Sequence, residues 1–421
     1  MGESKLEFDY KNLNFTQMRS FSCYKHQILA NYSNTEMAYE SYSHDNFIKF
    51  SILIMWDVHS EKQLWDCNMR DVCHVMTFSK DGKYVATGCH EGQILLYDAK
   101  NGNNIYDFNH PDSGNPLVNL SFSTSGSLLG CFENGDICLM DFSQNPVTEE
   151  YILQQAETQA TIHHACISNN GQKIVLTKGN DLFIWTYGNG DEIKGEKEEE
   201  GNVSNFSFSS DDKRIVSLSG GKVCVFNAET GKYILRPFVA HNGGAISVAF
   251  SNDNRMIVTT GKDPKLKYAV CVWDSNSGIC LLEPVPVHAD THYTHTSLSA
   301  FFCDNDELIV AGSDDGRIHV WNFVKCIIDQ YRKKYIPEVS RLDMAGYTND
   351  YPTGDALRIF WREKVLNYKG ALDNLASYPV LQLKIEEEKK KRWMSESQKR
   401  GKTVNLPTEE PGEEKTVKLR L

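Results

Sequence analysis

The sequence predicts an all-β fold, a ring of seven repeated four-stranded units, followed by a C-terminal extension of different character. Six segments share one pattern, in which two short apolar strands flank a polar turn and a third strand follows a second turn. The first-strand and third-strand anchors lie 18, 19 or, once, 23 residues apart. The pairs are Phe78/Tyr97, Phe122/Met140, Ile167/Trp185, Phe208/Phe226, Phe250/Trp273 and Phe302/Trp321.

This near-constant spacing indicates short antiparallel hairpins. One added residue would turn every later side chain of a strand to the opposite face, so the register of such strands cannot drift. Turn-forming pairs separate the first two strands. They are Asp81-Gly82, Ser125-Gly126, Asn170-Gly171 and Asp211-Asp212. The third-strand anchors recur every 41 to 48 residues, a period that suits four short strands and no helix.

A seventh unit is predicted at the N-terminus. The segment "MRSFSCYKHQILANYS" supplies two strands with Phe21 as anchor, and "SILIMWD" supplies the third with Trp56. These anchors lie 35 residues apart. The excess over the other units predicts an insertion of about 16 residues, roughly 35–50, between the second and third strands.

Three third strands carry a recognisable ending: "IMWD" at Trp56-Asp57, "CVWD" at Trp273-Asp274 and "HVWN" at Trp321-Asn322. On these endings, residues 5–330 resemble the WD-repeat family. The resemblance implies that each unit is a four-stranded blade and that the blades surround a channel. The expected fold of residues 1–330 is therefore a seven-bladed WD-repeat β-propeller.

The family also implies how the ring closes. An N-terminal segment usually supplies the outer strand of the last blade, and the candidates here are Leu6–Tyr10 and Leu13–Phe15. Closure of this kind removes an exposed sheet edge. The segment Cys326–Tyr331 is the alternative outer strand.

Blades of this family carry a hydrogen-bonded set of His, Ser or Thr, Asp and Trp. The sequence is similar at one full set and at one partial set, and most other units lack the set. A buried His–Asp pair is tolerated only where both members are bonded, so the resemblance implies that these residues specify blade packing. The full set is His288, Ser313, Asp315 and Trp321, and the partial set is His241, Asp263 and Trp273.

Two further segments interrupt the repeat. The first, Asp191–Gly201, reads as a charged loop before the fifth blade. The second, Gly261–Val270, lengthens the second turn of the sixth blade by about four residues. It carries Lys262, Lys265 and Lys267, which predict a basic patch facing an acidic partner such as tubulin or nucleic-acid phosphate, with a plain variable loop as the alternative. This blade resembles propellers of microtubule-associated and ciliary WD-repeat proteins.

Residues 331–421 predict helices followed by a disordered tail. They hold 19 Lys and Arg against 14 Asp and Glu, whereas the whole chain has a net charge of −12. An apolar helical face that includes Trp361 has to be buried on the propeller or on a partner. The candidate partner-binding residues of this extension are Trp361, Lys389, Lys390, Lys391, Arg392 and Trp393.

Motifs for chemistry are missing from the sequence. It contains no Gly-rich phosphate loop, Cys-pair zinc pattern or nucleophile elbow. The run "HADTHYTH" lacks the rest of a metal-ligand set. We therefore expect no enzyme activity, no cofactor, no metal and no small-molecule substrate. The twelve cysteines lie singly along the chain, so we expect them to be reduced.

These observations predict a non-enzymatic scaffold or adaptor that mediates protein–protein interactions in a multi-subunit assembly. We expect a cytoplasmic protein that does not bind membranes, and the resemblance at the sixth blade points to the cytoskeleton or cilium. The alternative is an RNA-associated WD-repeat subunit of a ribosomal or RNA-processing complex. In that case the basic residues of the tail would contact phosphate, because the acidic body argues against a general nucleic-acid binder.

Overall fold

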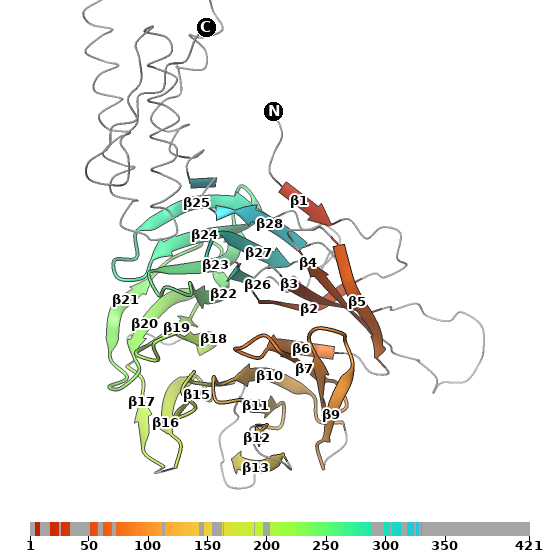
Figure 1. Ribbon diagram of the computed structural model, residues 1–421. Helices are drawn as coiled ribbons and strands as arrows, with labels where there is room; N and C mark the ends of the chain where they lie inside the picture. Colours follow the sequence, from red (N-terminus) through yellow and green to blue (C-terminus); the bar gives the residue numbers. More distant parts are fainter. Residues whose placement is uncertain are drawn as a thin grey trace, which may run out of the picture. The chain divides into compact units, whose positions relative to one another are not determined.

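The computed structural model repeats one element, a four-stranded antiparallel sheet, seven times (Figure 1). We call the sheets blades 1 to 7. Residues described by the structure are 5–8, 17–24, 27–33, 51–57, 62–69, 73–111, 114–142, 147–153, 162, 164–188, 190–196, 203–287, 299–303, 305–312, 318–323, 326–327 and 330.

The first four blades follow one another along the chain. Blade 1 contains β2 (Gln17–Tyr24), β3 (Gln27–Ser33), β4 (Ser51–Asp57) and β5 (Lys62–Met69). Blade 2 contains β6 (Cys73–Phe78), β7 (Tyr84–Cys89), β8 (Gln93–Asp98) and β9 (Asn104–Asn109). Blade 3 contains β10 (Leu117–Phe122), β11 (Ser127–Phe132), β12 (Ile137–Asp141) and β13 (Thr148–Leu153). Blade 4 contains β14 (Ala165–Ile167), β15 (Lys173–Lys178), β16 (Asp181–Thr186) and β17 (Glu192–Lys194).

The last three blades complete the series. Blade 5 contains β18 (Val203–Phe208), β19 (Arg214–Ser219), β20 (Lys222–Asn227) and β21 (Tyr233–Phe238). Blade 6 contains β22 (Ala245–Phe250), β23 (Met256–Asp263), β24 (Lys267–Asp274) and β25 (Cys280–Pro286). Blade 7 contains β26 (Ser299–Cys303), β27 (Leu308–Gly312), β28 (Ile318–Asn322) and β1 (Lys5–Phe8).

The blades form a closed ring. The first strand of each blade lies beside the first strand of the next, from β2 and β6 round to β26, which lies beside β2. This arrangement confirms the prediction of an all-β propeller. Backbone pairing gives the count of seven blades. Side chains are described for most of blades 2 to 7, whereas β1, β2 and β3 are described by their backbone alone.

The ring is joined by β1. This strand pairs antiparallel with β28, from Lys5↔Trp321 to Phe8↔Ile318, so an N-terminal segment is the outer strand of blade 7. The alternative segment is not a strand where it is described, because Cys326, Ile327 and Gln330 are helical. In blade 1, β3 and β4 pair up to Ser33↔Ser51. The predicted insertion therefore lies between them, outside the described residues.

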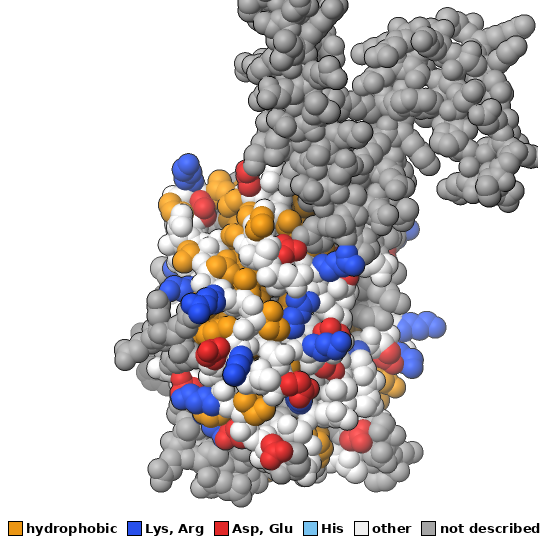
Figure 2. All heavy atoms as spheres, turned by 90° about the vertical axis from the view of Figure 1, so that its left-hand side faces the viewer, with side chains coloured by type: hydrophobic (Ala, Val, Ile, Leu, Met, Phe, Trp, Pro, Cys, Tyr) orange, Lys and Arg blue, Asp and Glu red, His pale blue; other side chains and the backbone are white. Residues whose placement is uncertain are grey.

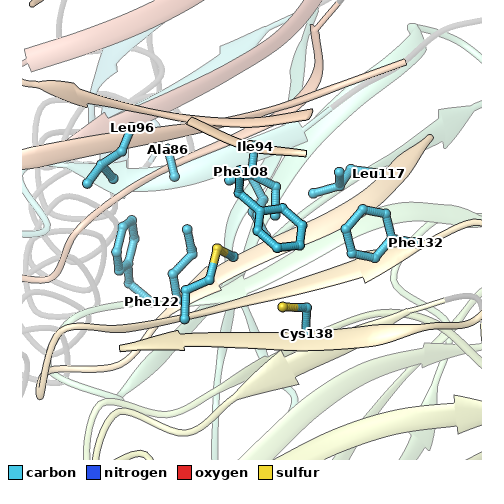
Figure 3. Packing of buried hydrophobic residues seen from close by; sticks show 11 residues of the cluster. Ala86, Ile94, Leu96, Phe108, Leu117, Phe122, Phe132 and Cys138 are labelled. Carbon is cyan, nitrogen blue, oxygen red and sulfur yellow. The ribbon is translucent and has the colours of Figure 1, made fainter. Parts of the chain in front are cut away.

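Apolar side chains of neighbouring blades share a core, as blades 2 and 3 illustrate (Figure 3). Both anchors of blade 3 are buried in it, Phe122 at 2% and Met140 at 0% exposure. Phe132 is fully buried and lies against Phe108 with ring centroids 6.4 Å apart. Each such side chain stabilises the fold by about 1.5–3 kcal/mol, so packing between blades holds the ring together.

The turns between the first two strands of blades 2 to 5 have the expected conformation. Their third turn residues, Gly82, Gly126, Gly171 and Asp212, have φ of 72°, 93°, 74° and 57°. Glycine adopts this region freely, and Asp tolerates it better than most residues. The turn pairs identified in the sequence are therefore confirmed as turns.

The structure corrects two expectations. The segment Asp191–Gly201 is not a loop throughout, because Glu192–Lys194 form β17 and pair with β16 as the outer strand of blade 4. A four-stranded blade needs an outer strand. A strand of only three residues is too short for alternation of apolar and polar residues to be recognised in the sequence. The expectation that all cysteines are reduced is also wrong. Ten described cysteines form no disulfide, but Cys303 is disulfide-bonded.

The chain divides into two compact units, Met1–Phe323 and Val324–Leu421. The first contains all seven blades. The predicted helices and tail of residues 331–421 lie outside the described residues. None of the helices in the part of the chain that is described is long and apolar enough to cross a membrane.

Candidate interaction site

The β23–β24 hairpin of blade 6 is longer than the corresponding hairpin of blade 5. Eight residue pairs join β23 and β24, from Met256↔Asp274 to Asp263↔Lys267, whereas six pairs join β19 and β20. The residues expected to lengthen a turn therefore lengthen the strands instead. The expectation of a longer turn is wrong because pairing continues to a short turn at 264–266.

Asp263 closes this short turn. Its Oδ1 accepts the backbone N–H groups of Leu266 at 2.9 Å and Lys265 at 2.8 Å. The same two bonds hold the pKa of the Asp263 carboxyl below its ordinary value, so the group is ionised at neutral pH. Lys267 adopts a φ of 64°, which completes the reversal of the chain.

The hairpin carries Lys262, Lys265 and Lys267, all exposed, which we call the hairpin lysines. The base of the hairpin is anchored to the preceding loop. The Lys262 N–H donates to the Gly244 carbonyl at 3.0 Å, and the Lys262 carbonyl accepts the Gly243 N–H at 3.0 Å. A Cβ at Gly243 would lie 2.5 Å from the Lys262 Cβ, so only glycine allows this approach. The hairpin therefore carries three lysine ammonium groups and the Asp263 carboxylate on a hydrogen-bonded backbone.

Below the hairpin, a threonine hydroxyl joins a histidine to a tryptophan. Thr259 Oγ1 lies 2.9 Å from His241 Nε2 and accepts the Trp273 Nε1–H at 2.8 Å. The hydroxyl can donate its own proton to Nε2, which places the imidazole proton on Nδ1. The predicted set of His241, Asp263 and Trp273 is corrected accordingly. Thr259 is the connecting residue, and Asp263 bonds the hairpin turn instead.

His241 is held neutral by its surroundings. The side chain is 4% exposed, and burial lowers the pKa of the imidazole to about 4. Gly261 on β23 makes room for the ring, because a Cβ there would lie 2.3 Å from His241 Cγ. The network therefore depends on a glycine that carries none of its hydrogen bonds.

Blades 2 and 5 keep the hydroxyl of this network without its partners. Thr87 and Ser217 occupy the position of Thr259, two residues after the residue that pairs with the third-strand anchor. The anchors are Tyr97 and Phe226, neither of which has an indole N–H. Both hydroxyl oxygens are buried without a hydrogen-bond partner. Blades 2 and 5 therefore show the same buried hydroxyl without the hydrogen bonds to His and Trp that it makes in blade 6.

Blade 3 contains a histidine–aspartate pair that the sequence analysis missed. His110 Nε2 lies 3.2 Å from Asp136 Oδ2, and both side chains are almost fully buried. Asn134 supports the aspartate, because its Nδ2 donates to Asp136 Oδ2 at 2.6 Å. The spacing from His110 to the second turn of the blade could have indicated this pair. It was missed because Met140 stands where the expected set has a Trp.

Several predicted site residues lie outside the described part of the chain. Of the full set, Trp321 is described, is 7% exposed and stacks on His319 with ring centroids 5.5 Å apart. The positions outside the described residues are His288, Ser313, Asp315, Trp361, Lys389, Lys390, Lys391, Arg392 and Trp393. Among the described residues, no group of three or more His, Cys, Asp or Glu side chains could hold a metal ion.

A closed ring of four-stranded antiparallel blades defines a β-propeller. Three segments, residues 61–98, 232–268 and 287–322, match the sequence profile of the WD domain, G-beta repeat. The match at 61–98 covers β5 to β8, so one sequence repeat takes its first strand from the preceding blade. No curated protein matches the chain. The protein is a WD40-repeat β-propeller, a class that generally serves as a protein-interaction scaffold and is typically non-enzymatic.

Proposed function

We propose that this protein is a non-enzymatic scaffold that joins other proteins in a multi-subunit assembly, and that the β23–β24 hairpin contacts an acidic surface of one partner. The observation that carries the proposal is the extended hairpin with its three exposed lysines. Its base is hydrogen-bonded to the loop before blade 6. Little conformational entropy is then lost on binding, which favours affinity.

The charge of the second turns differs around the ring. Blades 2 and 3 place Glu91 and Glu133 in these turns, whereas blades 5 and 6 place Lys222 and the hairpin lysines in or directly beside them. All these turns lie at the same end of the strands because the blades share one topology. A partner with an acidic patch would be steered towards blades 5 and 6.

The outer surface near β21 and β25 has a different character. Figure 2 shows this side of the ring with hydrophobic, basic and acidic side chains intermixed. On blades 5 and 6 the exposed large apolar side chains include Ile234, Val239 and Ile279. Single exposed apolar residues are ordinary on protein surfaces. The charged hairpin is therefore the better candidate for recognition.

The class of assembly is a further part of the proposal. A cytoplasmic or cytoskeletal complex, with an acidic protein such as tubulin as the partner, agrees with the charge of the hairpin. The family match does not select among assemblies, and neither the cytoskeletal nor the ciliary reading has support from it. RNA association would use the same cations and is distinguished by the experiment below.

The experiment reverses the hairpin charge in the full chain. Lys262, Lys265 and Lys267 are changed together to Glu, and cross-linked partners are identified by mass spectrometry. A matched variant carries the same charge change on exposed lysines at the other end of the strands. The control lysines are Lys100, Lys213 and Lys232.

We expect partners bound through the hairpin to be recovered with the wild-type and control chains and lost with the hairpin variant. An unchanged set of partners in the hairpin variant would contradict the proposed contact. Partners that disappear after nuclease treatment would instead indicate RNA. In that case RNA binding should weaken steeply with added salt and depend on residues 381–421.

A further inference from the structure

The turns between the first and second strands form a chain of hydrogen bonds from blade to blade. In blade 5, Asp212 accepts the backbone N–H groups of Asn169 and Asn170 in blade 4, at 2.7 and 2.8 Å. In blade 7, Asp306 accepts the N–H groups of Asn252 and Asp253 in blade 6, at 2.8 and 3.1 Å. A carboxylate thus caps two adjacent N–H groups of the preceding turn.

Blade 6 uses an amide at the same position. Asn254 Oδ1 accepts the Ser210 N–H of blade 5 at 2.7 Å. Asp212, Asn254 and Asp306 all have positive φ, of 57°, 62° and 69°. For Asp212 and Asn254 the residue's own N–H bonds the carbonyl three residues earlier. The third turn residue is therefore the position from which one blade caps the previous one.

Blade 3 has no side chain at this position, because its third turn residue is Gly126. Gly126 has a φ of 93°, and its N–H bonds the Ser123 carbonyl as in the other blades. The turn that it faces in blade 2 is Lys80-Asp81-Gly82, which follows Ser79. The hairpins β6–β7 and β10–β11 lie side by side (Figure 1). Two backbone N–H groups in blade 2 therefore lack the cap found in blades 4 and 6.

No protein acceptor bonds the N–H groups of Lys80 and Asp81 among the described residues. Blades 3 and 4 are joined by a different hydrogen bond at this position. Blade 4 also has a glycine, Gly171, but the Thr124 N–H of blade 3 donates to the Asn169 carbonyl at 2.6 Å. The interface of blades 2 and 3 is thus the described interface in which neither a side chain nor a carbonyl caps the preceding turn.

A cavity of about 180 Å³ lies at this position. It is lined by residues 79–81 and 122–126, with Tyr84 and Phe142 beside them. The volume corresponds to about six water molecules at their share of the liquid, enough for the carboxylate and methylene groups of an acidic side chain. The aromatic rings offer apolar contact to those methylene groups.

The charges around the cavity favour an anion. Lys80 lines it and is exposed, so its ammonium is available to an anion in the cavity. Asp81 is the acidic residue of the lining, but both its oxygens are engaged within its own turn. Oδ1 accepts the Ser79 hydroxyl at 2.7 Å and the Lys83 N–H at 3.1 Å, and Oδ2 pairs with Lys83 Nζ at 3.0 Å.

We propose that this cavity binds a carboxylate from an acidic segment of a partner protein. Its oxygens accept the N–H groups of Lys80 and Asp81, as the oxygens of Asp212 and Asp306 do in later blades. The Lys80 ammonium balances its charge. The site lies at the opposite end of the strands from the hairpin lysines, so the ring would hold two partners or two segments on opposite faces.

The test uses the full chain and a fluorescein-labelled peptide, Gly-Ser-Asp-Glu-Asp-Ser-Gly, followed by fluorescence anisotropy. The amide peptide Gly-Ser-Asn-Gln-Asn-Ser-Gly is the matched probe. A phosphoserine peptide and inorganic phosphate compete in separate titrations. We expect the acidic peptide to bind at least about tenfold more tightly than the amide peptide, equivalent to about 1.4 kcal/mol.

Two variants address the cavity. Gly126→Asp places the chain's own carboxylate where the ligand would bind, and we expect it to abolish peptide binding while circular dichroism shows that the fold is kept. Lys80→Ala is expected to weaken binding about threefold to tenfold while the fold is kept. The controls are Gly188→Asp and Lys100→Ala, which make similar changes at exposed turn positions outside the cavity lining and should leave binding within about twofold.

Three results would overturn the proposal. The first is no difference between the acidic and amide peptides, or no binding of either. The second is undiminished binding to the folded Gly126→Asp and Lys80→Ala variants. The third is tighter competition by phosphate or the phosphoserine peptide than by unlabelled acidic peptide, which would assign the cavity to phosphate instead.

Discussion

Replacement of Thr259 by Val tests whether the hydroxyl that joins His241 to Trp273 stabilises blade 6. The two side chains have nearly the same shape, so packing is kept and the hydroxyl is lost. Thr259 is fully buried, and both His241 Nε2 and Trp273 Nε1 lose their partner. A buried polar group left without a partner costs about 1–3 kcal/mol, and the half-buried Trp273 indole can regain some hydration. We expect a loss of about 2–4 kcal/mol in unfolding free energy.

The assay is thermal unfolding of the full chain, followed by circular dichroism. With an unfolding entropy of about 2 cal/mol/K for each residue, this loss lowers the melting temperature of the propeller by roughly 3–6 °C. Thr87→Val is the matched control, because the Thr87 hydroxyl is buried at the equivalent position without a partner. Its melting temperature should stay the same or rise slightly. Equal losses in the two variants would refute the assignment of stability to the hydrogen bonds.

Three further predictions follow from the same blade and from the ring closure. Because burial lowers the pKa of His241 to about 4, the unfolded chain binds a proton below pH 6.5 that the folded chain does not. The unfolding free energy should therefore fall by about 3 kcal/mol from pH 6.5 to 4, and His241→Gln should flatten this dependence in denaturant titrations. Gly261→Ala places a Cβ 2.3 Å from the His241 ring and should cost at least about 3 kcal/mol in urea unfolding, more than Gly130→Ala, where the nearest atom is the end of the Ile94 side chain. Deletion of residues 1–8 removes β1 from β28, and it should lower the melting temperature and increase light scattering at the exposed edge; an unchanged protein would contradict the closure.

Much of the fold could be predicted because it repeats. The anchors Phe122 and Met140 are both buried between blades, as their near-constant spacing required. The positive φ at Gly82 and Asp212 follows from turn chemistry that is local to a few residues. An N-terminal outer strand was also predictable, because an unpaired sheet edge is unfavourable wherever it occurs.

The candidate sites were less predictable, because they depend on which residues face one another. Asp263 was expected to pair with His241, but its carboxylate accepts two N–H groups of the hairpin turn. Thr259 reads as an ordinary strand residue until its register with Trp273 is known. Hairpin length posed a similar problem, since extra residues can lengthen either a turn or both strands.

By itself, the sequence determined that this protein is a propeller of short antiparallel strands, because strand register and turn conformation are set by neighbours along the chain. It also determined the basic character of the hairpin. Only the tertiary structure decided that Thr259 joins His241 to Trp273 and that the turn beside Gly126 is left without a cap. Both depend on groups that come together from separate strands or separate blades, and such distances are settled only when the ring closes.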